Sequence, residues 1–309
     1  MKNILAYYYS IHPSEISHKD DKYFFEYFDN EYVFEPFRRP MSDVECLYNI
    51  NKEMLKRNLL VHEIILNNEN KVLTYVNNEP YVLIQINVNK NARITLPEIC
   101  HINNSSINID CEKILDRFDW VNLWETKNDY FESQISEIGV KYPNLSNYAN
   151  YYIGLAENAI TYVRNIFNFN DNAYKSICHK RINNNGNLFE LYHPMNFVCD
   201  YRVRDAAEYI KSTFFNEDNA YELVEEYLKN NLLSYKEALL FYGRLLYPSY
   251  FFDIYDDIVN NNLEENLIEK IINKSDEYEI FLLNVYYLLS KIFNQYIPAV
   301  DWIIKRSYF

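Results

Sequence analysis

The chain has 309 residues, of which 49% are hydrophobic and 24% charged, a balance that supports a folded core and excludes a disordered protein. At this length two lobes or domains are more natural than one compact core. The formal net charge of −14 argues against nucleic acid or a membrane surface as partner, because proteins that bind phosphates carry extended clusters of Lys and Arg. Only short clusters occur here, such as Arg38-Arg39 and Lys180-Arg181.

The cysteines give no sign of a metal or redox motif. They are odd in number, lie far apart and include no CxxC pair, so we expect neither a zinc knuckle nor the disulfide framework of a small secreted protein. The first residues lack the apolar segment of a secretory signal, and no window approaches the ~18 apolar residues of a membrane span. We therefore expect a cytoplasmic protein. The five cysteines are Cys46, Cys100, Cys111, Cys178 and Cys199.

Residues 1–100 are expected to form a small N-terminal lobe built on an antiparallel sheet. Aromatic and β-branched residues on either side of Asp29-Asn30 are typical of a β-hairpin. Ser42 followed by Glu45 is a capping-box signature that marks a helix start. In chain order, the pattern predicts a hairpin over residues 23–37, a helix over residues 42–60 and a second hairpin over residues 71–88.

Residues 101–309 are expected to form a large, mainly α-helical C-terminal lobe, with the boundary near residues 90–110. Hydrophobic residues recur here every three or four positions, which is the period of an amphipathic helix. A non-helical interval over residues 168–201 contains apolar pieces at 187–191 and 195–199 that are compatible with a small hairpin. Helices are predicted over residues 114–138, 151–167, 205–215, 220–230, 234–246, 253–260, 264–272 and 276–293.

The positions of the glycines limit the chemistry. All four, Gly139, Gly154, Gly186 and Gly243, lie beyond residue 138. A loop that cradles phosphates needs glycine, because its backbone N–H groups must approach the phosphates closely and often take a positive φ. The sequence therefore contains no Walker loop, no dinucleotide-binding fingerprint and no glycine-rich kinase loop.

Several segments resemble a known family; they include Cys178-His-Lys-Arg181 and residues 120–124, 152–159, 196–205 and 243–248. They are similar to the spore-coat-associated, kinase-like proteins of Gram-positive bacteria, which are distant relatives of aminoglycoside and choline phosphotransferases. The resemblance extends over most of residues 20–305. It implies an α+β, bilobal protein-kinase-like fold with a small antiparallel-sheet N-terminal lobe and a large helical C-terminal lobe.

The resemblance also assigns candidate catalytic residues. In the active relatives, a His-Gly-Asp loop supplies the catalytic aspartate, and a later strand end supplies an aspartate that binds magnesium. His179 matches the loop histidine, and Arg181 falls at the position of the catalytic aspartate, where a cation cannot act as a base. Asp200 matches the metal-binding aspartate. The candidate site is therefore degenerate.

The remaining site residues of the relatives have less certain counterparts. Arg38 is the nearest cation to the expected phosphate-binding lysine, and Glu45 or Glu53 could be the helix glutamate that pairs with it. The loop asparagine could be any of residues 183–185, because spacing does not choose among them. Asp205 matches a later aspartate that is structural in the relatives.

Plain structural interpretations compete with these assignments. A lone histidine such as His179 is more often a packed, hydrogen-bonded residue than a catalytic one. Asp200 could form an ion pair with Arg202 or Arg204 instead of holding Mg²⁺.

The leading hypothesis is a pseudokinase: a kinase-like protein that has lost catalytic competence, binds protein partners and, as the resemblance implies, is a spore coat or spore assembly component. One alternative is an atypical small-molecule phosphotransferase in which Asp200 holds the metal and another carboxylate replaces the base; only then is Mg-ATP a cofactor. A second alternative is a structural protein whose surface tyrosines are cross-linked, since the chain has 31 Tyr. A/T-rich codons would produce the same tyrosine excess.

Overall fold

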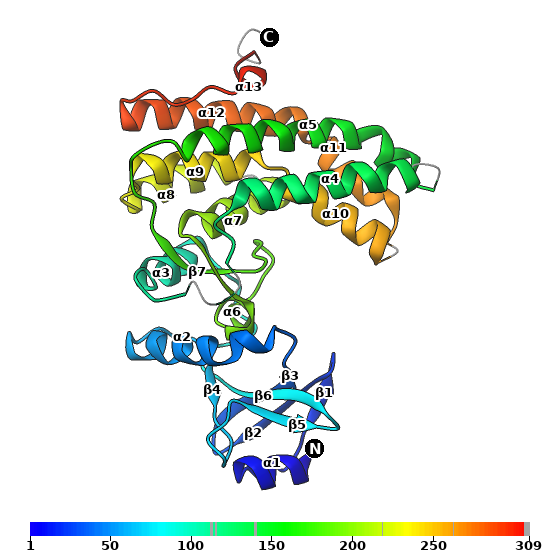
Figure 1. The fold of residues 1–309 in the computed structure, drawn as a ribbon, viewed down its shortest axis with the longest axis vertical. Helices are drawn as coiled ribbons and strands as arrows, with labels where there is room; N and C mark the ends of the chain where they lie inside the picture. The colour runs from blue at the N-terminus through cyan, green and yellow to red at the C-terminus, as the bar shows by residue number, and fades with distance from the viewer. Residues whose placement is uncertain (112–113, 115, 139–140, 218, 262, 306–309) are drawn as a thin grey trace. The chain divides into compact units, whose positions relative to one another are not determined.

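The computed structural model describes residues 1–111, 114, 116–138, 141–217, 219–261 and 263–305. The chain forms two compact units (Figure 1). The first comprises Met1–Asp116 and Lys175–Asp200, and the second comprises Arg117–Tyr174 and Tyr201–Phe309. Residues 175–200, which the sequence analysis assigned to the C-terminal lobe, thus belong to the same unit as the N-terminal sheet.

The first unit is built on a six-stranded sheet with the order β1-β2-β3-β6-β4, in which β5 also pairs with β6. The pairs are antiparallel, so both predicted hairpins, β2–β3 and β5–β6, are confirmed. The sequence pattern missed β1 and β4, because three residues are too few to show an alternation. The strands are β1 (Ser17–Lys19), β2 (Lys22–Tyr27), β3 (Asn30–Pro36), β4 (Glu63–Ile65), β5 (Leu73–Val76) and β6 (Glu79–Ile86).

The tight turns of this sheet are made without glycine. Asp and Asn are the residues besides glycine that adopt a positive φ most readily, and two-residue hairpin turns require that conformation. Asp20 and Asp21 provide it between β1 and β2, and Asn77 and Asn78 provide it between β5 and β6. A lobe without glycine can therefore still form close hairpins.

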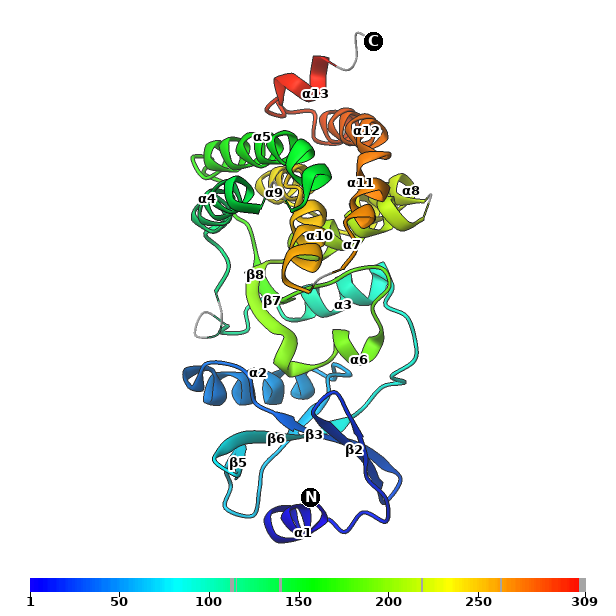
Figure 2. The ribbon, with the colours of Figure 1, turned by 90° about the vertical axis from the view of Figure 1, so that its right-hand side faces the viewer.

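Two helices cover opposite faces of the sheet (Figures 1 and 2). Helix α1 (Lys2–Tyr9), which was not predicted, packs Leu5 and Tyr9 into a hydrophobic cluster with Phe34 and Leu83 of the sheet. The Tyr9 hydroxyl also lies 2.9 Å from the Thr74 hydroxyl. Helix α2 (Val44–Lys56) buries its apolar positions on the other face.

The start of α2 differs from the predicted capping box. A short 3-10 turn, Met41–Asp43, precedes the helix, and the N-cap residue Asp43 makes no side-chain cap hydrogen bond. The Asp43 carboxylate is instead held by Arg39 at 2.8 Å. The start of α2 therefore carries an Arg39–Asp43 ion pair in place of the predicted Ser42–Glu45 capping box.

The first unit also contains α3 (Leu96–Ser105), β7 (Lys175–His179), α6 (Leu188–Leu191) and β8 (Phe197–Tyr201). The expected hairpin between residues 187–191 and 195–199 does not form. The Asn187 side chain accepts a hydrogen bond from the Glu190 N–H at 2.9 Å and caps a helix there, while β8 pairs with β7.

The second unit is helical, and a helix forms in every region where one was predicted. The predicted helix over residues 114–138 begins only at Trp120, and in the predicted helix over residues 264–272 the segment Glu265–Ile268 is a 3-10 turn. The capping box at the start of α9 is also confirmed, since the Ser234 hydroxyl accepts from the Glu237 N–H and the Glu237 carboxylate accepts from the Ser234 N–H. Among the described residues, no helix is both long and apolar enough to cross a bilayer. The helices are α4 (Trp120–Ile138), α5 (Pro143–Ile166), α7 (Val203–Asn216), α8 (Ala220–Asn230), α9 (Tyr235–Leu246), α10 (Ser249–Asn260), α11 (Glu269–Ile272), α12 (Ser275–Phe293) and α13 (Asp301–Lys305).

Candidate functional site

His179, at the end of β7, is a packed side chain that is 1% exposed. Its Nε2 lies 2.6 Å from the carbonyl oxygen of Leu191, and because a carbonyl only accepts, this nitrogen must carry the proton. The ring also lies edge-on to Phe197. His179 therefore ties the end of β7 to the end of α6.

The register of β7 and β8 separates Arg181 from Asp200. The Lys180 N–H donates to the Asn196 carbonyl at 2.8 Å, and the Arg202 N–H donates to the Tyr174 carbonyl at 3.0 Å. These two bonds define an antiparallel pair in which residue 176 lies opposite residue 200. At about 3.4 Å per residue, the backbones of Arg181 and Asp200 are on the order of 15 Å apart. The strand pairing does not bring these two site residues together.

The loop after Arg181 is held by its own asparagines. The Asn183 side chain accepts from the Asn185 N–H at 3.0 Å, and its carbonyl accepts from the Gly186 N–H at 3.2 Å. The Gly186 carbonyl in turn accepts from the Ile94 N–H at 3.1 Å. Asn183 is therefore the residue that forms this turn, while Asn184 is buried.

Asp200 is fully buried on β8. Of the two arginines that follow it, Arg202 has its Nε 2.6 Å from Glu237, and Arg204 has its Nη1 2.8 Å from Asp205. Asp205 is also fully buried, which suits the structural role that the resemblance gave it.

Arg38 and Glu53, the candidate nucleotide-binding pair, have other partners. The Arg38 guanidinium lies 2.7 Å from Asp21, and both side chains are mostly exposed. Glu53 lies 3.3 Å from Arg57 and 3.6 Å from Lys56 on the same helix. Exposed pairs of this kind contribute little to stability.

The buried arginine of this region is Arg39. Its guanidinium holds Asp43, as described above, and its Nη1 donates to the carbonyls of Met195 at 3.2 Å and Phe197 at 2.5 Å. The side chain is 2% exposed. Arg39 therefore fastens the start of β8 to the segment that precedes α2.

A cluster of ionisable residues that the sequence did not reveal surrounds a buried carboxylate of β3; we call it the Glu35 cluster. It consists of Lys22 on β2, Glu35 on β3, His62, and His193 in the segment after α6. Lys22 Nζ lies 2.8 Å from Glu35 Oε2, and His193 Nε2 lies 3.2 Å from Glu35 Oε1. Glu35 and His193 are nearly completely buried.

The environment keeps Glu35 ionised. Burial alone would raise the pKa of its carboxyl, but His193 and Lys22, through charge and hydrogen bonds, outweigh burial and lower the pKa to about 2. Burial lowers the pKa of His62 to about 3, and the neighbouring His193 adds to this effect. His62 is therefore neutral, with Nε2 donating to the Phe189 carbonyl at 3.1 Å and Nδ1 accepting from a backbone N–H at 3.2 Å.

The chemistry of the cluster is that of a fixed anion. One carboxylate on β3 is contacted from two sides, by Lys22 and by the His193 ring, and 158 positions separate Glu35 from His193. The only local signal was a charged residue within the apolar run Tyr32-Val-Phe-Glu35. Within the described ranges, no group of three or more His, Cys, Asp or Glu side chains is arranged to hold a metal ion.

The model of the family described as "Spore coat putative kinase YutH" matches residues 2–285. The chain belongs to this family. The endospore coat-associated protein YutH of Bacillus subtilis (strain 168) is 31% identical over 176 residues. That match covers 51% of each chain, so this YutH-family chain spans about half the length of the curated relative.

Solved structures confirm the fold class. An aminoglycoside phosphotransferase from Alicyclobacillus acidocaldarius matches with a TM-score of 0.65 at 8% identity, over 94% of this chain and 96% of that one. Spectinomycin phosphotransferase, solved with ADP and spectinomycin, matches with a TM-score of 0.56 at 12% identity, over 87% and 91%. At these identities the likeness shows the fold alone. The YutH-family chain thus has the predicted α+β, protein-kinase-like fold.

Proposed function

We propose that this YutH-family chain is a kinase-like protein without phosphotransfer activity, made in the cytoplasm, which binds protein partners during assembly of the spore coat. The observation that carries the proposal is the distribution of charge in the first unit. The resemblance aligns a cation, Arg181, with the catalytic aspartate of the relatives, and a carboxylate, Glu35, is the buried charge of the third strand.

The charge on β3 is opposite to what phosphate binding needs. In protein kinases a lysine on the third strand of the N-terminal sheet binds the phosphates and pairs with a glutamate of the following helix. Strand β3 carries no Lys or Arg, and its Glu35 is held ionised by Lys22 and His193. A phosphate brought to this position would meet a negative charge.

The turn between β1 and β2 adds further negative charge. In protein kinases a glycine-rich loop covers the phosphates. Here the β1–β2 turn consists of Asp20 and Asp21, which are exposed. Their carboxylates repel an anion, and their side chains occupy space that glycine would leave open. The loss of a general base is typically worth about 10²–10⁴ in rate, and these features weaken substrate binding as well.

Nucleotide binding and turnover test the proposal. We expect Mg-ATP and Mg-ADP to leave the melting temperature unchanged, since a ligand at 100 times its Kd would stabilise the protein by about 2.7 kcal/mol. We also expect no ADP release with aminoglycosides, spectinomycin or choline as acceptors. Asp200→Asn and the surface control Glu26→Gln should then behave like the wild type. Mg-ATP-dependent phosphorylation of an acceptor that Asp200→Asn abolishes and Glu26→Gln preserves would overturn the proposal.

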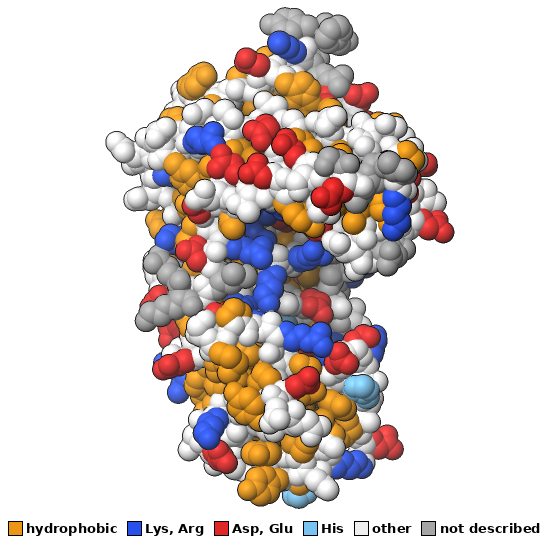
Figure 3. Space-filling model, turned by 45° about the vertical axis from the view of Figure 1, so that its right-hand side comes forward, with side chains coloured by type: hydrophobic (Ala, Val, Ile, Leu, Met, Phe, Trp, Pro, Cys, Tyr) orange, Lys and Arg blue, Asp and Glu red, His pale blue; other side chains and the backbone are white. Residues whose placement is uncertain are grey.

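A second candidate function, a cross-linked structural component, is supported by the exposure of the tyrosines. Figure 3 shows hydrophobic side chains gathered over the lower part of the view. Tyr7 of α1 and Tyr75 of β5 are 73% and 56% exposed. Mass spectrometry after treatment with a peroxidase and hydrogen peroxide would detect dityrosine at these positions. Recovery of only monomeric protein without dityrosine would contradict this second function. The exposed tyrosines among the described residues are Tyr7, Tyr75, Tyr130, Tyr148, Tyr151, Tyr174, Tyr287 and Tyr296.

A further inference from the structure

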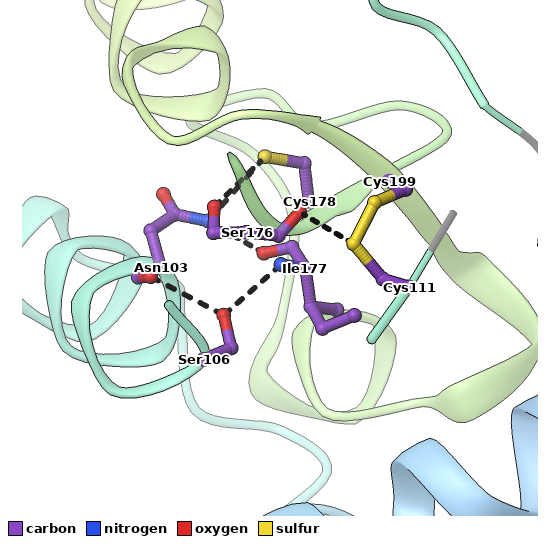
Figure 4. Close-up of a disulfide and its surroundings, with 7 residues drawn as sticks. All are labelled: Asn103, Ser106, Cys111, Ser176, Ile177, Cys178 and Cys199. Carbon is purple, nitrogen blue, oxygen red and sulfur yellow. Dashed lines mark hydrogen bonds between the residues drawn. A yellow bond between two sulfur atoms is a disulfide. The ribbon is translucent and has the colours of Figure 1, made fainter. Parts of the chain in front are cut away.

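A disulfide joins Cys111, in the segment after α3, to Cys199 on β8 (Figure 4). The sequence analysis expected no disulfide framework, and 88 positions separate the two cysteines, so nothing local marks them as a pair. Their Cα atoms are 5.4 Å apart, within the usual range for a disulfide. Cys199 immediately precedes Asp200, the candidate metal-binding residue.

The end of α3 is also bound to β7, by side chains that replace a neighbouring strand (Figure 4). The Ile177 N–H donates to the Ser106 hydroxyl at 3.0 Å, and the Asn103 side chain donates to the Ile177 carbonyl at 2.9 Å. Both backbone groups of Ile177 are thus satisfied from α3. This polar attachment does not depend on the state of the cysteines.

The attachment to β8 does depend on it. Besides the disulfide, one parallel bridge pairs Asp116 with Cys199, and the ring of Phe118 contacts that of Tyr201. The disulfide is the covalent link between Cys111 and the strand that carries Asp200. Cutting it removes this link from β8, which keeps its pairing with β7 and its hydrogen bond from Arg39.

We propose that the Cys111–Cys199 pair is a redox-sensitive lock on β8. In the reducing cytoplasm the pair is a dithiol, and in an oxidising environment it closes to the disulfide. This inference rests on the disulfide and its surroundings and is independent of whether the chain transfers phosphate.

In the reduced state the Cys111 thiol has a hydrogen-bond acceptor nearby. Cys111 Sγ lies 3.9 Å from the Ser176 carbonyl, which can accept the proton that the sulfur gains on reduction. Both sulfur-bearing residues are buried, at 2% and 0% exposure, so exchange requires local opening and closed protein changes state slowly.

The redox step is balanced by an external dithiol. Dithiothreitol gives two electrons and two protons to the bond, becomes a cyclic disulfide, and leaves two thiols at Cys111 and Cys199. Closure runs in reverse with an oxidised disulfide such as oxidised glutathione as the acceptor. The other cysteines, Cys46, Cys100 and Cys178, are not disulfide-bonded.

Thiol counting on the full chain tests whether the bond forms. The protein is equilibrated with oxidised glutathione or dithiothreitol, freed of reagent, denatured and alkylated with a maleimide that adds a known mass. We expect labelling at Cys46, Cys100 and Cys178 in the oxidised protein, and at all five cysteines after reduction. Labelling at all five after oxidation would show that no bond forms and would overturn the proposal.

Thermal unfolding and hydrogen exchange test whether the bond is a lock. Because it closes a long loop, we expect reduction to lower the melting temperature by on the order of 10 °C. Exchange in peptides that cover residues 197–201 should accelerate, while peptides of β3 and β6 keep their rates. A reduced protein with unchanged melting temperature and unchanged exchange in these peptides would show that the bond is inert.

Two variants sharpen the result. Cys111→Ser should match reduced wild type under both conditions, and Cys100→Ser, on α3, should keep the full response to dithiothreitol. If Cys111→Ser does not fold, the comparison of oxidised and reduced wild type decides the question alone. A response in Cys111→Ser as large as in wild type would show that another pair carries the effect, against the proposal.

Discussion

Replacing Glu35 by Gln tests whether the charge of the buried carboxylate stabilises the first unit. Burial acts to raise the pKa of this carboxyl, but His193 and Lys22 prevail and hold it at about 2, against the ordinary 4.5. One pKa unit corresponds to about 1.4 kcal/mol, so the ionised form contributes on the order of 3 kcal/mol to the free energy of unfolding. The neutral amide keeps the shape and loses this contribution.

The pH dependence follows from the direction of the shift. Because the folded protein binds this proton less tightly than the unfolded chain, the contribution is complete above about pH 4.5 and is lost as the pH falls toward about 2. We expect Glu35→Gln to lower the free energy of unfolding by about 3 kcal/mol at about pH 6, and the difference from wild type to shrink below about pH 4.5.

The assay must report on the first unit. All three tryptophans (Trp120, Trp124 and Trp302) lie in the second unit, so tryptophan fluorescence would follow the wrong part of the chain. Hydrogen exchange of peptides that cover β3, measured in urea at several pH values, gives the local free energy of opening. Glu26→Gln, an exposed carboxylate on the adjacent strand β2, is the matched control. A cost below about 1 kcal/mol at about pH 6, or one independent of pH, would refute the reasoning.

Two further substitutions test the described contacts by urea unfolding. Arg39→Lys should cost about 2–3 kcal/mol, because lysine cannot hold Asp43 and two carbonyls at once, whereas exposed Arg38→Lys should stay within about 0.5 kcal/mol; equal costs would contradict the role given to Arg39. Ser234→Ala should cost about 1 kcal/mol by removing the observed cap of α9, and Ser42→Ala should cost less, because the structure shows no cap bond there; the opposite ranking would contradict the structure.

Local patterns predicted the elements that are long or bounded by strong signals. The β2–β3 and β5–β6 hairpins are rich in aromatic and β-branched residues. Their two-residue connections have the required positive φ at Asn77 and Asn78 and at Phe28 and Asp29, the latter one position before the predicted Asp29-Asn30 turn. The long helices repeat their apolar positions over several turns, and Ser234 marks the start of α9. Strand β1 has three residues, all exposed, and gives no period at all.

The site was less accessible to prediction because its contacts are long-range. The resemblance placed His179, Arg181 and Asp200 on one short stretch of chain, yet their distance in space depends on strand register, which a single sequence does not specify. The partners of Glu35 and of Cys199 come from distant parts of the chain. A buried charge in an apolar strand indicates that a partner exists, and it does not identify that partner.

The absence of glycine from the N-terminal lobe has a different meaning once the turns are known. Asp20 and Asp21 adopt the conformation that glycine would provide, so the lack of glycine does not prevent this hairpin from forming. The proposed loss of phosphate binding therefore rests on charge, because aspartates form the turn and a glutamate is the buried ion of β3. Lys22, which begins β2, is committed to Glu35 at 2.8 Å and is therefore not a substitute for the missing phosphate-binding lysine. Lys22 balances the buried anion of the sheet, and under the proposed function this ion pair leaves less positive charge for a nucleotide.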